Sequence, residues 1–390
     1  MKKIKFLIIV CFLILLTGCY NYRELNQLAI TSAIGINKDD SGYELIIQVI
    51  NTQKQGADGS TSGDMPKFVV YKSKGRTLQE AFRNIIVESP KRLYVNHLSL
   101  LIISEKVAKE GIDDILDIFA RDSEFQKQFL VVISKEENTE DVMSILTSLE
   151  MLNAKNIKDS IITDTKYLGS AFTVSFEDLL KIYLNNKIDL SLPSVIMEGS
   201  VKKGEESSNI QESKASGSVK LSDLAIFDES KLVGYLNKED AINVSTLKNF
   251  IDDTIYTYKC DDENYISIEI IDSKSDIKVN TNDKIEINVT QKANLNEVNC
   301  SINLEKQSDL NKLEKNMSKD IEKSISETIK KLINEYKSDI IGFEDMIYKD
   351  NPKYYKILVE KYNDDLLKSI DFKVKVDLKL YAKGNILKEI

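Results

Sequence analysis

The clearest pattern in the chain is a strict alternation of apolar and polar residues in its second half. Apolar side chains stand at every second position in the segments 266–270, 285–289 and 372–380. Alternation of this kind is typical of strands whose sheet has one buried face and one face in water. The pattern therefore predicts an antiparallel sheet in the C-terminal part of the chain.

A second pattern, between these strands, has a different period. Apolar residues recur three and four positions apart at Leu310, Leu313, Met317, Ile321, Ile325, Ile329, Leu332, Tyr336 and Ile340. This spacing predicts a long amphipathic helix with one continuous apolar stripe. The stripe could cover the sheet of its own domain, or it could bind a partner or a membrane surface. We favour the first alternative, because the strands supply an open face and the polar side of the helix mixes lysines with acidic residues.

The first half of the chain changes repeatedly between strand and helix patterns. Apolar runs at 25–36 and 43–50 flank a polar turn, which predicts a β-hairpin. The segments 98–104, 105–119 and 129–134 have the patterns of strand, helix and strand. Such a succession predicts a βαβ crossover, and together with the C-terminal sheet it predicts a mixed fold of the α+β class.

Local signals set the ends of further elements. Thr77, with Glu80 three residues later, forms a capping box, which predicts a helix that ends at Pro90. Pro193 lies within a strand-like run at 189–196, and we expect an edge strand there because proline cannot donate to a β-ladder. Two more helices are expected at 139–149 and 175–184.

A polar stretch near the middle of the chain predicts the main domain boundary. Residues 200–217 are mostly Gly, Ser, Lys, Glu, Asn and Gln, and so polar a segment cannot offset the entropy of its own ordering. We expect a linker there, between an N-terminal mixed α/β domain at 19–199 and a C-terminal α/β domain at 218–390. The N-terminal part is long enough for two subdomains, which gives two or three domains in all. The alternative is a long loop inside one domain.

The first 19 residues have a pattern of their own. Three lysines among the first five residues precede an uncharged apolar run at 6–16, and small residues then lead to Cys19. The run of 11 residues is too short for a transmembrane helix, which needs about 20. We interpret 1–18 as a lipoprotein signal peptide and the Cys19 thiol as the site of lipidation. The alternative is an ordinary secretory signal followed by a chance cysteine.

Charge narrows the range of partners. Loss of 1–18 removes three lysines and leaves 50 basic and 62 acidic side chains. An acidic protein is not expected to bind nucleic acid, which requires clustered lysine and arginine. The same charge argues against broad electrostatic adhesion to anionic lipid. Attachment to the lipid bilayer would therefore depend on the acyl chains at Cys19.

Few residues carry a catalytic signature. His97 is the single histidine, and no Gly-x-Ser-x-Gly motif presents a serine to it. The sequence has no His-Glu-x-x-His zinc motif and no glycine-rich phosphate loop, and the acidic runs 39–40 and 261–263 lack the spacing of a calcium loop. We therefore expect no enzyme activity, no cofactor and no metal, although a pair of catalytic carboxylates could be hidden among 62 acidic residues. A surface hydrolase that uses His97 is the alternative.

Two cysteines lie far from the signal peptide. Cys260 and Cys300 could form one disulfide in an exported protein, or they could remain as thiols. Their spacing is not that of a metal site.

Three parts of the chain resemble one protein family. The segment Leu16-Thr17-Gly18-Cys19-Tyr20-Asn21-Tyr22-Arg23-Glu24-Leu25, with Gly35-Ile36-Asn37 downstream, is similar to the start of the C-subunit lipoproteins of spore germinant receptors, the GerC type. Tyr20 stands where tryptophan is usual in that family. The hairpin sequence 224–236 and the segment 339–343, followed by 352–355, resemble later parts of the same family, so the resemblance covers essentially the whole chain.

The resemblance implies a function that composition and spacing do not reach. Members of this family are held by lipid at the outer face of the spore inner membrane, beside the membrane-embedded A and B subunits of the receptor. The chain is then expected to be a non-catalytic receptor subunit that is needed for the response to nutrient germinants. Cys19 is the functional residue that this expectation assigns. The alternative is a solute-binding lipoprotein of a transporter.

Overall fold

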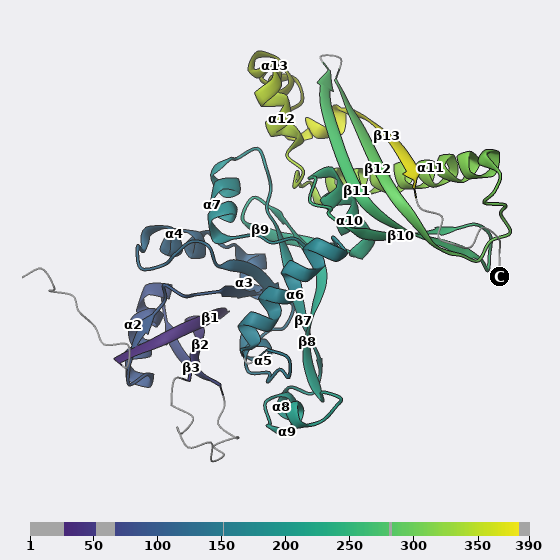
Figure 1. The fold of residues 1–390 in the computed structure, drawn as a ribbon. Coiled ribbons are helices and arrows are strands. Elements are labelled where there is room, and N and C mark those ends of the chain that lie inside the picture. The colour runs from purple at the N-terminus through teal and green to yellow at the C-terminus, as the bar shows by residue number, and fades with distance from the viewer. Residues whose placement is uncertain (1–26, 52–66, 151, 281–282, 382–390) are drawn as a thin grey trace, which may run out of the picture.

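The computed structural model describes residues 27–51, 67–150, 152–280 and 283–381. These residues form two β-sheets with helices packed on them, so the predicted mixed fold is confirmed. A nine-stranded sheet occupies one end of the molecule and a four-stranded sheet occupies the other (Figure 1).

The large sheet has the strand order β3-β2-β1-β5-β6-β7-β8-β9, and β4 pairs with β1 outside this path. Its strands are β1 (Leu28–Asp39), β2 (Gly42–Ile50), β3 (Phe68–Gly75), β4 (Arg92–Tyr94), β5 (Leu100–Ser104), β6 (Leu130–Ser134), β7 (Ser191–Gly199), β8 (Gly217–Asp228) and β9 (Lys231–Leu236). β1 and β2 form the predicted antiparallel hairpin, and β5 and β6 are the parallel strands of the predicted crossover. The predicted hairpin and the predicted parallel strand pair are therefore confirmed.

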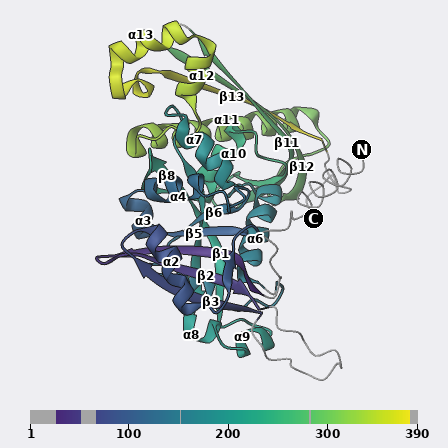
Figure 2. The ribbon, with the colours of Figure 1, turned by 90° about the vertical axis from the view of Figure 1, so that its left-hand side faces the viewer.

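Helices cover both faces of the large sheet (Figure 2). On one face lie α5 (Thr139–Met143) and α6 (Asn153–Tyr167), and on the other lie α2 (Leu78–Glu88), α3 (Glu105–Glu110), α4 (Asp113–Arg121) and α7 (Phe176–Leu184). Every residue of β5 and β6 is buried. Burial on both faces explains why these two strands are apolar without alternation.

Two helix predictions need correction, and one helix was missed. The helix expected at 105–119 is two helices, α3 and α4, because Gly111 has a φ of 127°, which no helix contains. The helix expected at 139–149 ends at Met143. Helix α6 was not predicted, although Ala154, Ile157 and Ile161 have helical spacing and are buried against the sheet.

The prediction that Pro193 marks an edge strand is wrong. β7 lies inside the sheet and pairs with β6 on one side and β8 on the other. β6 reaches only Ser194 and Val195, and the pairing with β8 shifts register between Pro193 and Val195. The proline therefore lies at a bulge, where no ladder bond needs its missing N–H group.

The segment 200–217, which we expected to be a linker, contains the short helices α8 (Val201–Gly204) and α9 (Ser208–Gln211). The buried Asn209 amide ties the segment to the fold: its nitrogen donates to Leu146 and Gly217 carbonyls, and its oxygen accepts from backbone N–H groups. The strands on either side, β7 and β8, pair with each other. The domain division at this segment stays a prediction.

The small sheet has the order β10-β11-β12-β13. Its strands are β10 (Thr254–Lys259), β11 (Tyr265–Asn280), β12 (Lys284–Val298) and β13 (Asp371–Leu380). The first three are antiparallel, as expected, whereas β13 runs parallel to β12. The parallel pair is possible because a long crossover through α11 (Gln307–Lys331), α12 (Phe343–Asp350) and α13 (Pro352–Tyr362) joins the two strands.

Helix α11 covers the small sheet, as we predicted from its apolar stripe. Met317, Ile325 and Ile329 are buried against the strands. The helix continues through one π-helical segment, η2 (Leu332–Tyr336), and ends at Lys337, which has a left-handed conformation. Ile340 therefore lies outside the helix, although its spacing fitted the stripe.

The outer edge of β13 is occupied by side chains of α11. Three alternate backbone N–H groups in the second half of the strand donate to these side chains, in the pairs Val376 to Glu322, Leu378 to Ser318 and Leu380 to Glu314. The helix therefore supplies the hydrogen bonds that a further strand would otherwise make.

Cys260 and Cys300 form a disulfide, which settles the alternative left open by the sequence. The bond joins the chain just after β10 to the chain just after β12, across 40 positions of sequence. It therefore closes one end of the small sheet covalently.

Removal of this disulfide is expected to destabilise the protein. A double Cys260→Ser, Cys300→Ser variant should lose about 2–5 kcal/mol of unfolding free energy, because the open loop regains entropy in the unfolded chain. Urea unfolding of both proteins measures the difference. A reducing agent should reproduce the loss in the parent protein and leave the double variant unchanged, and a loss below about 0.5 kcal/mol would contradict the prediction.

Truncation of the apolar stripe is expected to be costly for the same sheet. Ile325→Ala leaves a cavity under α11 and should lower the unfolding free energy by about 2–5 kcal/mol. Lys319→Ala, on the exposed side of the same helix, should change it by less than about 0.5 kcal/mol. Equal effects of the two variants in urea unfolding would show that α11 does not stabilise the sheet through its stripe.

Candidate functional site

Cys19, the one functional residue that the sequence predicts, lies outside the described residues. Its lipidation therefore stays a prediction. The described chain begins at Gln27, immediately before β1. Among the described residues, no helix has the length and apolar character that a membrane span requires.

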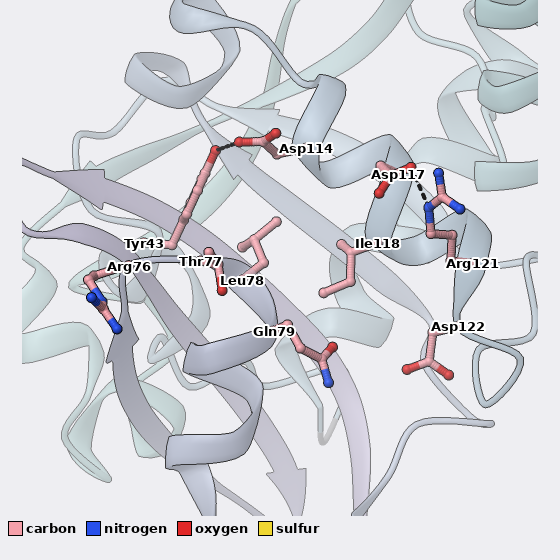
Figure 3. Close-up of a pocket in the computed structure, with 10 residues that line it drawn as sticks. All are labelled: Tyr43, Arg76, Thr77, Leu78, Gln79, Asp114, Asp117, Ile118, Arg121 and Asp122. Carbon is pink, nitrogen blue, oxygen red and sulfur yellow. Dashed lines mark hydrogen bonds and ion pairs between the residues drawn. The ribbon is translucent and has the colours of Figure 1, made fainter.

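A pocket of about 510 Å³ lies in the large-sheet part of the molecule, between the start of α2 and one side of α4 (Figure 3). Its lining combines side chains of both charges with a few apolar ones: Tyr43, Arg76, Thr77, Leu78, Gln79, Asp114, Asp117, Ile118, Arg121 and Asp122. The sequence pattern predicted none of these as a binding residue.

The capping box at the start of α2 holds the residues on that side of the pocket in position. Thr77 Oγ1 accepts a hydrogen bond from the N–H of Glu80 at 3.2 Å, which confirms the predicted helix start. Glu80 Oε2 accepts from the N–H of Arg76 at 2.9 Å, one residue earlier than in a standard capping box. The two bonds hold the residues before α2 in one conformation at the pocket rim.

On the α4 side, the polar groups are already bonded to one another. The Tyr43 hydroxyl donates to Asp114 Oδ2 at 2.6 Å. Burial of the hydroxyl and, to a lesser extent, the nearby Asp114 carboxylate raise the pKa of Tyr43 well above its ordinary value. Arg121 Nε donates to Asp117 Oδ1 at 2.7 Å (Figure 3). This arrangement offers binding surface for a small polar molecule. It presents no nucleophile paired with a base, which acyl-transfer chemistry would need.

His97 lies apart from this pocket. It is exposed, and its ring packs edge-on against Tyr94 with a centroid distance of 5.4 Å. The contacts described for its imidazole include no serine and no carboxylate. The described residues also contain no group of three His, Cys, Asp or Glu side chains that could hold a metal ion.

A second polar site lies where the two sheets meet. Asp189 precedes β7, and its carboxylate accepts from the N–H of Asp339 at 2.6 Å and from the N–H of Glu229 at 3.0 Å. In return, the N–H of Asp189 donates to the carbonyl of Asp339 at 3.1 Å. Residues 150 positions apart are therefore joined by three main-chain groups and one carboxylate. We call Asp189 and Asp339 the sheet joint.

The Asp339 carboxylate is itself buried and bound to backbone. Its oxygens accept from the N–H groups of Gly342 and Glu344, both at 2.8 Å. Burial nevertheless raises the pKa of Asp339 to about 7, with repulsion from Glu344 in the same direction. Lys248 Nζ donates to the carbonyl of Ile340 at 2.6 Å, and burial lowers the pKa of Lys248 to about 8. Burial therefore shifts the pKa of Asp339 and the pKa of the neighbouring Lys248 towards neutral pH.

The sequence drew attention to one half of the sheet joint, the segment that contains Asp339. The segment 339–343 resembles a motif of the germination family, and in the structure it caps α12 and meets Asp189. Nothing near Asp189 in the sequence indicated its partner. Only the fold brings the two aspartates together.

Comparison with known proteins gives matches along most of the chain. Residues 21–197 match the family model described as the spore germination protein N-terminal domain. Residues 222–384 match the model described as spore germination B3/GerAC like, C-terminal.

Individual relatives match shorter segments. Spore germination protein KC of Bacillus subtilis (strain 168) is 33% identical over 247 residues, which are 62% of this chain and 60% of that protein. Spore germination protein B3 of the same strain is 29% identical over 142 residues, which are 36% of this chain and 37% of that protein. The chain thus aligns with only part of the length of these curated relatives.

The crystal structure of the GerBC protein has a similar fold. Its TM-score with this chain is 0.55 at 21% sequence identity, and the alignment covers 89% of this chain and 96% of that one. At this identity the likeness establishes a shared fold and nothing further.

The buried Asp339 predicts a particular pH dependence of stability. Between its ordinary pKa of 3.8 and about 7, the folded chain holds a proton that the unfolded chain has released, so this group contributes less to stability as the pH rises through that window. Asp339→Asn stays neutral. Relative to the parent, its unfolding free energy should therefore improve by roughly 1–4 kcal/mol between pH 4.5 and pH 8.

Urea unfolding of both proteins at the two pH values measures this gap. Asp40→Asn, in the exposed turn between β1 and β2, is the control and should show no such change. A gap between Asp339→Asn and the parent that is the same at both pH values would contradict the assignment.

Proposed function

Since the chain belongs to the GerC-type, or Ger(x)C, family of spore germination proteins, we propose that it is the lipid-anchored C subunit of a germinant receptor. In this proposal it is not an enzyme. It sits at the outer face of the spore inner membrane beside the membrane-embedded A and B subunits, and it is needed for the response to nutrient germinants.

The order of the two family models carries this proposal. The N-terminal and C-terminal models follow each other along one chain and together span residues 21–384 with a single short gap. The relatives that the chain matches include spore germination proteins named A3, B3 and KC. These names support a role in spore germination, and membership of a receptor complex is what the resemblance in the first residues implies.

Residues 16–19 support the lipid anchor independently of the fold. Leucine, two small residues and cysteine follow an apolar run that is too short to span a bilayer. Two acyl chains on one cysteine suffice for stable attachment, since each buried methylene contributes about 0.8 kcal/mol. An acidic protein body then needs no electrostatic attraction to lipid.

A non-catalytic role agrees with the chemistry of the described residues. In the pocket, Tyr43 is bonded to Asp114 and Arg121 to Asp117, and the carboxylates of the sheet joint are bonded to main-chain groups. Contact with other subunits, rather than turnover of a substrate, is therefore the activity we assign.

Substitution of Cys19 tests the proposal. In spores that carry Cys19→Ala, the protein should lose palmitate labelling and leave the membrane fraction, because the acyl chains on Cys19 are its proposed anchor and no helix of the described residues could span a bilayer. Germination with nutrients should then fall to the level of the deletion strain. Palmitate incorporation, detergent phase partition and loss of optical density measure the three effects.

Cys11→Ala is the matched control, since that cysteine lies in the signal run and should leave with it. This variant should keep label, location and germination. Cys19→Ala protein that is still labelled and membrane-bound would refute the anchor. If the parent protein is labelled but deletion of its gene leaves nutrient germination unchanged, the anchor stands and the receptor role is refuted.

A further inference from the structure

An exposed apolar pair stands at the end of helix α2. The side chains of Ile86 and Val87 are 66% and 86% exposed. Single exposed aliphatic residues are ordinary on protein surfaces, but adjacent ones at a helix end, followed by an exposed proline and lysine at 90 and 91, form a small amphiphilic surface. We call Ile86, Val87, Pro90 and Lys91 the α2 tip.

The α2 tip is held in shape by its own hydrogen bonds. The N–H of Ser89 donates to the carbonyl of Ile85 at 2.8 Å and closes the helix. The Ser89 hydroxyl donates to the carbonyl of Lys91 at 2.8 Å and accepts from its N–H at 3.3 Å. The turn therefore presents the apolar pair and the lysine on a fixed frame.

The tip lies next to the point where the chain enters the fold. β4 follows the tip directly and pairs with the first residues of β1, with Arg92 opposite Leu28. Val87 and Arg92 are five positions apart in the sequence, so the two lie at most about 18 Å apart. Helix α2 and strands β1–β3 lie together at the end of the molecule opposite the small sheet (Figure 1).

The length of the chain before β1 limits how far this end can be from the membrane. Cys19 and Gln27 are eight positions apart, and a fully extended chain of that length spans at most about 29 Å. A lipid on Cys19 therefore keeps the start of β1, and with it the α2 tip, near the bilayer surface. This step rests on the lipidation given under the proposed function.

The chemistry of the tip fits a lipid surface better than it fits water. Two aliphatic side chains gain free energy in the interfacial layer, and a lysine beside them meets the phosphates of the headgroups. Arg92 is engaged in an ion pair with Glu124 at 2.6 Å. Lys91 and Glu88 are both exposed at the turn, so the charges beside the apolar pair balance, and the attraction to the bilayer comes from the two aliphatic side chains. Such a contact is too small to bind by itself, but it can orient a protein that a lipid already holds.

We propose that the α2 tip inserts into the headgroup layer of the bilayer that carries the Cys19 lipid. The contact orients the large sheet with its α2 end against the membrane and directs the small sheet away from it. The occupant of this surface is lipid, and no other subunit is needed to cover it.

Depth measurement on the lipidated full chain tests the proposal. With Cys19 lipidated and Cys260 bonded to Cys300, an introduced cysteine is the one thiol available for labelling. Val87→Cys carries an environment-sensitive fluorophore, and the protein is reconstituted through its lipid into vesicles of phosphatidylcholine and phosphatidylglycerol with brominated acyl chains. Leu184→Cys is the control, because Leu184 is also apolar and 73% exposed but lies at the end of α7.

The label at 87 should lose at least half of its fluorescence to the brominated lipid, and the label at 184 should lose less than a tenth. Equal quenching at the two positions, whether strong or weak, would overturn the proposal, since a protein-covered or water-exposed tip gives no difference. Protein that fails to float with the vesicles at all marks a failure of the lipid anchor, which vesicle flotation reads separately from quenching. In that event a nickel-chelating lipid and a short histidine tag in place of residues 1–19 restore the tether without leaving Cys19 as a second thiol, and the same comparison decides.

Discussion

The arrangement of the molecule depends on two aspartates at the sheet joint whose oxygens are used by backbone N–H groups. Asp189 holds the chain that leaves the long helix, and Asp339 holds the start of α12. Removing either carboxylate leaves buried donors without partners, which costs more than the bonds contribute when they are made. Three strands of the small sheet, the covering helix α11 and the disulfide lie between the two aspartates in the chain. The bonds of the sheet joint act together with others between the same parts, such as those from Tyr336 to the Tyr235 carbonyl and from Ser338 to the Phe227 carbonyl.

Periodicity predicted the parts of the fold that depend on local sequence. The alternating strands, the long stripe of α11 and the hairpin of β1 and β2 are confirmed, because burial of one face imposes its period on the sequence. The errors arose where a single residue decides the geometry. Gly111 breaks a helix through its φ value, and Pro193 is accepted inside a sheet because a bulge removes the need for its N–H.

The functional sites show a different limit. The pocket combines residues from β2, α2 and α4, and each of its pairs is made by tertiary packing or by one turn of helix, so no local pattern could have predicted it as a whole. The aspartates of the sheet joint are 150 positions apart. The lipidation predicted for Cys19, in contrast, depends only on the residues next to it in the sequence. A signal peptide is recognised as an extended segment rather than as part of a folded site, so no tertiary contact is needed to predict it.

The side chains of α11 along the rim of β13 bear on how copies of the protein behave when they are crowded. An exposed strand edge is a template onto which another molecule can add, and stacking of this kind continues from copy to copy. Here the donors at alternate positions of the last strand are already bonded to Glu314, Ser318 and Glu322. Another strand can therefore pair less readily with this rim, so closely packed copies of the protein carry less risk of fibrous aggregation.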